Sequence, residues 1–181
     1  VIVRDEDSPD EPVTSIQLFG GRVRAETLFH LEHFDSLVKL ELWSRGVTDA
    51  GLGHIRGLKH LRELSLAHCA VTDDGLASLA DLKELEHLNL CDTQVTGDGL
   101  KHLHGLDRLC VLYLNRTSVT DKGLEQLEGL TGLEVLRLAH TPITDAGLKH
   151  LKGMRDLRLL DLSHTQITDE GLSALAGLHE L

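Results

Sequence analysis

The segment LDLSHTQITDEGL, residues 160–172, brings together side chains that could do chemistry. Within nine positions it holds Asp161, Ser163, His164, Thr165, Thr168 and Asp169. A serine, a histidine and an aspartate are the residue types of a hydrolytic triad, and histidine with a carboxylate is a common ligand set for zinc. The alternative is a scaffold in which these polar side chains have structural roles. The rest of the chain distinguishes the two.

A repeat of 24 residues runs through most of the chain. Its marker is a Val or Ile followed by Thr, found at Val47, Val71, Val95, Val119, Ile143 and Ile167. A Gly-Leu pair begins four residues after each marker. Within one unit, the three-residue steps of Leu52, Ile55 and Leu58 indicate a short helix. Leu64 and Leu66 alternate with polar residues, as in a strand. We therefore expect each unit to be a short strand, a turn, and a helix or helix-like crossover.

The strand part of each unit carries a recognisable pattern. Residues 61–71, LRELSLAHCAV, fit L-x-x-L-x-L-x-x-N/C-x-L with Val as the closing residue. Together with the recurring T-D-x-G-L, this resembles the leucine-rich repeat family, in the 24-residue bacterial type common in planctomycete proteins. The resemblance implies an α/β fold: a right-handed solenoid, or horseshoe arc, with a parallel β-sheet on its concave face and short helices on its convex face. It also implies a protein–protein interaction module rather than an enzyme.

The repeat register divides the chain into a cap and an array. We expect residues 1–22 to form an N-terminal hairpin cap and the first strand, with DEDSPDEP as a charged turn; a disordered acidic tail is the alternative. Residues 23–181 form the array: a degenerate first repeat (23–46), five full repeats (47–166) and a partial last repeat (167–181). The last repeat leaves an apolar edge without a polar cap, which indicates a fragment of a larger protein or end-to-end self-association.

Two polar columns of the repeat have expected scaffold roles. The Asp after each marker Thr is expected at a helix N-terminus, where it suits the helix dipole and Thr or Asp can accept a backbone N–H; Gly97 replaces it in the third unit. The column of the family's N/C position is expected to turn inward and satisfy backbone groups of the following loop. Its members are Cys69, Thr93, Thr117, Thr141 and Thr165. Most of the polar residues in the opening segment are thereby explained.

Strand alternation predicts which side chains face outward on the sheet. Because Leu160 and Leu162 point into the core, Asp161 and its equivalents point to the concave face. These columns vary from unit to unit in charge and size, as a recognition surface would, although a solvated face could vary as well. The partner-binding candidates are Phe19, Glu41, Trp43, His68, Asn89, Asp92, Tyr113, Arg116, Arg137, His140, Asp161 and His164. Two of them, Phe19 and Trp43, are expected to form an exposed aromatic patch or to cover the edge of the N-terminal core.

The histidines at the end of the strands are the remaining candidate for chemistry. His140 and His164 fall on adjacent units beside Asp161, so the three could in principle bind zinc. No second shell is apparent, and the repeats have equal lengths, so the sequence encodes no lid or deep cleft. It also lacks a Gly-rich phosphate loop and a G-x-S-x-G motif. We therefore predict no catalytic residue, no metal and no cofactor; a metal-dependent enzyme and a spacer within a larger protein are the alternatives to a binding module.

Composition and net charge limit the classes of partner and the cellular compartment that the chain suits. The formal charge is −11, and an acidic surface repels nucleic acid and anionic membranes. No apolar run is long enough to cross a membrane. Three cysteines without a CxxC spacing indicate free thiols, which favours a reducing, cytoplasmic compartment. A signal segment preceding Val1 would instead allow export. We expect an unidentified protein as partner.

Overall fold

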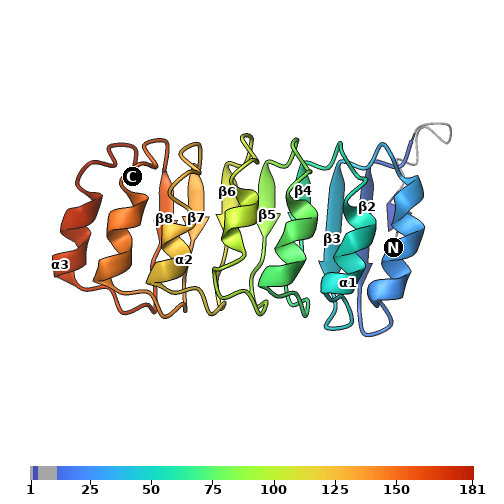
Figure 1. The fold of residues 1–181 in the computed structure, drawn as a ribbon, viewed down its shortest axis with the longest axis horizontal. Coiled ribbons are helices and arrows are strands. Elements are labelled where there is room, and N and C mark those ends of the chain that lie inside the picture. The colour runs from blue at the N-terminus through green and yellow to red at the C-terminus, as the bar shows by residue number, and fades with distance from the viewer. Residues whose placement is uncertain (1, 4–11) are drawn as a thin grey trace.

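The computed structural model describes residues 2–3 and 12–181. One open sheet runs along the molecule, and helices form a second layer on one side of it (Figure 1). The strands are β1 (Ile2–Val3), β2 (Ser15–Phe19), β3 (Lys39–Trp43), β4 (Glu63–Ser65), β5 (His87–Asn89), β6 (Val111–Tyr113), β7 (Val135–Arg137) and β8 (Leu159–Asp161). Their order in the sheet follows the sequence, and every pair from β2 to β8 is parallel. This confirms the predicted α/β solenoid.

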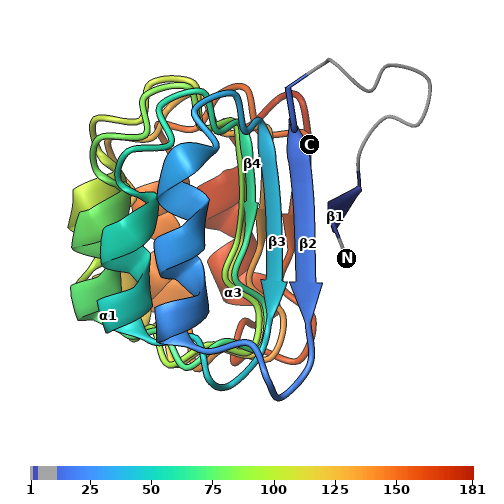
Figure 2. The same cartoon turned by 90° about the vertical axis from the view of Figure 1, so that its right-hand side faces the viewer.

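The helical layer consists of short segments, most of them 3-10 helices. They are η1 (Ala25–His33), α1 (Asp49–Leu52), η2 (Gly53–Ile55), η3 (Asp73–Leu79), η4 (Leu100–Leu103), α2 (Asp121–Glu125), η5 (Asp145–Leu151), α3 (Asp169–Leu172) and η6 (Ser173–Leu175). Strands pack about 4.8 Å apart, whereas packed α-helices need about 8–10 Å. Stacking therefore spreads the helical side and leaves the sheet on the inner, concave side. Figure 2 shows the helices in one layer and the strands in the other. The narrower 3-10 helix reduces this mismatch.

The core lies between the two layers and consists of stacked rows of leucines. One row contains Leu40, Leu64, Leu88, Leu112 and Leu136, which are register partners in successive strands and at most 2% exposed. Each leucine contacts the layer of its own repeat and the rows of its neighbours. No repeat could bury these side chains alone, so stability depends on stacking.

The inward column after each strand is confirmed. Thr93, Thr117 and Thr141 are buried. Each donates its hydroxyl hydrogen to the carbonyl oxygen three residues earlier in its own chain segment, at 2.7, 2.7 and 2.6 Å. Cys69 instead donates from Sγ to the carbonyl of Leu42, 3.6 Å away in the preceding repeat. The column thus satisfies carbonyl groups where the ladder of the sheet ends.

The Asp after each marker Thr lies at a helix N-terminus, as predicted, and has a further role that was not predicted. Where a side chain caps the helix, Thr does so: the side chains of Thr72, Thr144 and Thr168 each accept the backbone N–H two residues later. The Asp side chain reaches forward into the next repeat. Asp49 Oδ1 accepts the backbone N–H of Thr72 at 2.9 Å, and its Oδ2 accepts the Thr72 hydroxyl at 2.6 Å. We call this pair of hydrogen bonds the Asp–Thr bridge.

The Asp–Thr bridge recurs with one interruption. Asp121 with Thr144 and Asp145 with Thr168 repeat the geometry. Asp73 makes the largest set, accepting from the Thr96 N–H and hydroxyl and from the N–H groups of Gly97 and Gly99. The next bridge is missing because Gly97 has no carboxylate to offer.

Glycine at position 97 is required by the packing there. Gly97 has φ of +115°, and a Cβ atom on it would lie 2.5 Å from the Cα of Gly123. The two repeats therefore meet backbone against backbone. Nearby, Asp98 forms an ion pair with Lys122 at 2.9 Å on the surface.

The two ends of the array differ. β1 pairs antiparallel with β2, with Ile2 opposite Ile16. The turn expected between the two strands, residues 4–11, lies outside the described residues. The division of the chain into cap and array remains a prediction. At the other end, Leu160 and Leu162 are only partly buried. Leu172 and Leu181 are 50% and 48% exposed. The core of the last repeat is therefore open on one side.

Replacement of Thr117 by Val should destabilise the protein. The change leaves the Leu114 carbonyl without its donor, at a cost of about 1–3 kcal/mol in the free energy of unfolding. Thr131→Val is the matched control, because Thr131 is exposed and has no hydrogen bond from its side chain within the described residues. Denaturant unfolding of both variants measures the difference. Equal stability of Thr117→Val and wild type would contradict this role.

Replacement of Asp73 by Asn should destabilise the protein in a pH-dependent way. Desolvation alone would raise the pKa of Asp73, but the hydrogen bonds from Thr96, Gly99 and Gly97 outweigh it and lower the pKa in the folded state. The stabilisation is therefore complete above the pKa of the unfolded chain and is lost as the pH falls through the lower, folded pKa.

At pH 7 we expect Asp73→Asn to cost about 1–3 kcal/mol, and we expect its difference from wild type to shrink below about pH 4. Asp98→Asn, which removes only a surface ion pair, should cost less than about 1 kcal/mol. Thermal melts over a pH series test both. If the two variants are equally stable at pH 7, the bridge does not stabilise the array.

Candidate functional site

The concave face of the sheet presents the predicted columns in register. The middle column, Gln17, Glu41, Ser65, Asn89, Tyr113, Arg137 and Asp161, consists of successive Cα partners. A second outward column lies two residues earlier on each strand. It consists of Ser15, Lys39, Glu63, His87, Val111, Val135 and Leu159. The sequence interpretation missed this column as a site, although the same strand alternation predicts it.

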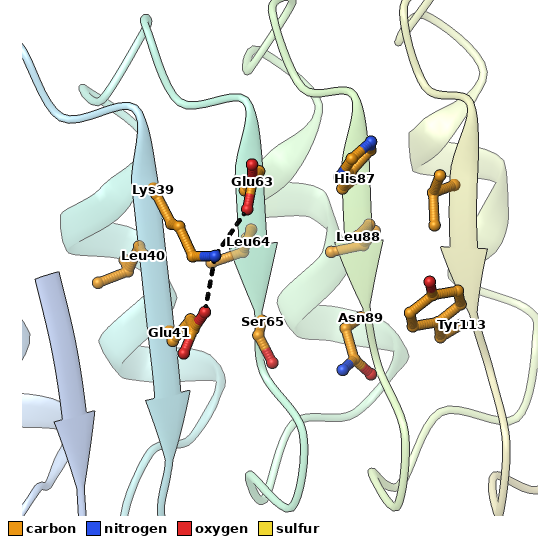
Figure 3. Close-up of a pocket in the computed structure, with 11 residues that line it drawn as sticks. Lys39, Leu40, Glu41, Glu63, Leu64, Ser65, His87, Leu88, Asn89 and Tyr113 are labelled. Atoms are coloured by element: carbon orange, nitrogen blue, oxygen red, sulfur yellow. Dashed lines mark ion pairs between the residues drawn. The ribbon is translucent and has the colours of Figure 1, made fainter. Parts of the chain in front are cut away.

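A shallow depression of about 300 Å³ lies on the concave face between β3 and β6. Figure 3 shows Lys39 reaching between Glu41 and Glu63, at 3.0 and 2.9 Å. Hydrogen bonds to Glu63 and Glu41 raise the pKa of Lys39, so its ammonium stays charged. The depression continues past Asn89 to Tyr113. Its charges are already paired within the chain.

The predicted aromatic patch is present at the end of these strands. Phe19 and Trp43 are register partners, and 52% of each is exposed. The Trp43 ring stacks on His68, with centroids 4.1 Å apart and planes at 19°. His68 Nδ1 pairs with the Asp92 carboxylate, which also accepts from Arg45 at 3.1 Å. The Trp43 side of the aromatic patch therefore rests on His68, which is in turn fixed by Asp92 of the following repeat.

The polar row after the strands has a backbone cause. Its residues, His68, Asp92, Arg116, His140 and His164, all have φ between 54° and 59°. This is the left-handed region, in which Asp and His are enriched among non-glycine residues. Gly20, at the same position of an earlier repeat, has φ of 103°. The Asp and His residues that suggested chemistry at this position are therefore explained in part by its left-handed backbone. Gly20, at the same position in the repeat, was the sequence signal for this conformation.

The opening Ser-His-Asp group does not form a nucleophile–base pair. Ser163 donates its hydroxyl hydrogen to Asp161 Oδ1 at 2.6 Å. His164 stacks on His140, with centroids 4.2 Å apart and planes at 10°. Among the described residues there is no group of three or more His, Cys, Asp or Glu side chains placed to hold a metal ion. The predicted histidine row is therefore two stacked pairs, one with Trp43 and one between histidines.

These polar groups shift one another's pKa. Hydrogen bonds from the Ser163 hydroxyl and N–H lower the pKa of Asp161. Desolvation lowers the pKa of His140, and so do the charges of His164 and Arg116, against an opposing effect of Asp161. Asp161 is therefore charged near neutral pH, whereas His140 favours its neutral form.

The C-terminal half of the face differs from the N-terminal half. The guanidinium of Arg137 lies over the Tyr113 ring, with its carbon 4.9 Å from the centroid. Val111, Val135 and Leu159 form an apolar row beside this pair, and Leu159 is 38% exposed. Of the candidates, the structure brings Phe19, Trp43 and His68 together near the N-terminus, and Tyr113 and Arg137 together nearer the C-terminus. The role of the candidates in binding remains a prediction.

None of the helices in the described part of the chain combines the length and hydropathy that a membrane span requires.

Comparison with known proteins places the chain among repeat proteins. A model of the family "Leucine Rich repeat" matches residues 57–80, 130–152 and 153–176. No curated protein matches the chain in sequence. Internalin C2 from Listeria monocytogenes is 28% identical with a TM-score of 0.78, over 93% of this chain and 69% of that chain.

Two further solved structures show the fold alone. An internalin (inlF) from Listeria monocytogenes is 22% identical with a TM-score of 0.54, and the match covers 93% of this chain and 59% of that chain. The structure of PEPR1-AtPEP1 is 19% identical with a TM-score of 0.60, and the match covers 94% of this chain and 24% of that chain. In both cases this chain corresponds to less than two thirds of the longer protein.

Proposed function

Because the chain is a leucine-rich repeat protein, we propose that it binds a protein partner through the concave face of its sheet and the turns that follow the strands. Leucine-rich repeat proteins are generally protein-binding modules and are typically not enzymes. The observation that carries the proposal is the contrast between columns. The core rows repeat the same leucines, whereas the middle outward column changes its residue on every strand, from Glu41 through Ser65, Asn89, Tyr113 and Arg137 to Asp161.

The rigidity of this face supports the proposal. The outward side chains stand on paired strands, and the adjoining turns are fixed by the Thr column and by left-handed residues. Binding to a preorganised surface loses little conformational entropy. The exposed aromatic Trp43 and the cation Arg137 belong to the residue types that dominate binding energy in protein interfaces.

The double variant Trp43→Ala/Arg137→Glu should abolish capture of the partner. Wild type used as bait in an extract of its source organism should retain a specific protein, and the double variant should not. Phe29→Ala/Lys101→Glu is the matched control, because it makes the same chemical changes at exposed residues of the helical face. A partner retained equally by all three proteins would contradict binding at the concave face. Absence of any partner would favour the spacer role.

Self-association through the C-terminal edge is a second proposal, favoured by the exposed Leu172 and Leu181. Two copies that cover this edge should give a mass that rises toward a dimer with concentration in size-exclusion light scattering. The variant Leu172→Gln/Leu181→Gln should stay monomeric, whereas Phe29→Gln, at an equally exposed apolar residue, should behave as wild type. A monomeric wild type at all concentrations would rule this pairing out.

A further inference from the structure

Resting on the proposed function, we infer that the C-terminal half of the concave face recognises an acidic segment of the partner. An Asp or Glu carboxylate of that segment binds the guanidinium of Arg137. Aliphatic side chains next to it pack on the row formed by Val111, Val135 and Leu159. The site therefore recognises a peptide segment in which a carboxylate side chain is flanked by apolar side chains.

The first observation is that Arg137 has no acceptor of its own. Within the described residues its side chain has neither a hydrogen bond nor an ion pair, and its Nε is buried without a partner. The Tyr113 ring supports the guanidinium but accepts no conventional hydrogen bond from it. The Asp161 carboxylate, in register on the next strand, accepts both hydrogen bonds of Ser163 at Oδ1. Asp161 feels the charge of Arg137, which contributes to its lowered pKa, but the two form no hydrogen bond or ion pair. Arginine presents its donors in a planar fork that matches a carboxylate.

The second observation is the contrast with the other cations near this face. Lys39 lies between two glutamates, and Arg45 is paired with Asp92. Arg116, in the turn after β6, has an exposed side chain without an acceptor among the described residues. The chain has 29 acidic residues against 18 Lys and Arg, so acceptors are abundant, yet these two arginines have none. The guanidinium groups of Arg116 and Arg137, which have no acceptor among the described residues, thus favour an acidic segment of the partner on this half of the face.

The third observation is the apolar row directly beside Arg137. Val111, Val135 and Leu159 are Cα partners on three successive strands. They stand two residues before Tyr113, Arg137 and Asp161, and therefore on the same face. An aliphatic row favours a peptide with apolar side chains. It does not suit a nucleic acid, whose sugar-phosphate backbone offers no aliphatic side chains to this row.

A phage-displayed library of random dodecapeptides, selected on the folded wild-type chain, tests the inference. Enriched peptides should carry Asp or Glu next to aliphatic residues. Synthetic copies of one such peptide should lose at least about tenfold in affinity for Arg137→Gln, because a charge-assisted hydrogen-bonded pair is removed. Changing the peptide carboxylate to its amide should have a similar effect, and the two changes together should cost less than their sum.

Controls separate this inference from the proposed function. Lys39→Gln removes the same charge from the same face and should leave affinity within about twofold, because its charge is already paired within the chain. Thermal melts verify that the variants fold. Peptides affected by Trp43→Ala but not by Arg137→Gln would overturn the inference and leave the proposed function standing. Peptides affected by neither variant bind elsewhere and count against both. A selection that enriches no peptide on wild type contradicts the inference, while capture of the whole partner still decides the proposed function.

Discussion

Every strand of the sheet must lie about 4.8 Å from the previous one, in the same register, from one end of the array to the other. A period of 24 residues without insertions meets this constraint, because it places equivalent residues of successive repeats at equivalent positions in the structure. The buried leucine rows, the inward Thr column and the Asp–Thr bridges all follow from it, because each links a residue to its counterpart in the same or the next repeat. Because the loops are uniform as well, most of the variation between repeats falls on the side chains of the outward columns.

Much of the fold could be predicted because periodicity reports packing directly. The alternation around Leu160 and the spacing of the marker Val-Thr pairs predicted strands, register and core. The bridges could not be predicted, since an Asp after Thr is a common helix start and its reach into the following repeat depends on three-dimensional spacing. The mostly 3-10 character of the helices was also missed, because it arises from the mismatch between strand and helix spacing rather than from local preference.

The candidate site was predictable in its columns but not in its contacts. Strand alternation brought Phe19 beside Trp43 and placed Tyr113 beside Arg137. The stacking of His164 on His140, and the donation of Ser163 to Asp161, depend on side-chain rotamers that one-dimensional patterns do not encode. The left-handed turns explain why polar residues recur there without implying chemistry. Which cations lack an acid partner became apparent only once the side chains were placed.

The missing carboxylate at Gly97 has a mechanical meaning. In a linear array each repeat couples only to its neighbours, so the molecule behaves as a series of joints. The joint between the repeats that begin at Val95 and Val119 lacks the Asp–Thr bridge of its neighbours, and has there the close backbone contact of Gly97 with Gly123 and the surface ion pair of Asp98 with Lys122. Tyr113 and Arg137 stand on opposite sides of this joint. A ligand that contacts both side chains would add a link between these two repeats, at the joint that lacks the Asp–Thr bridge.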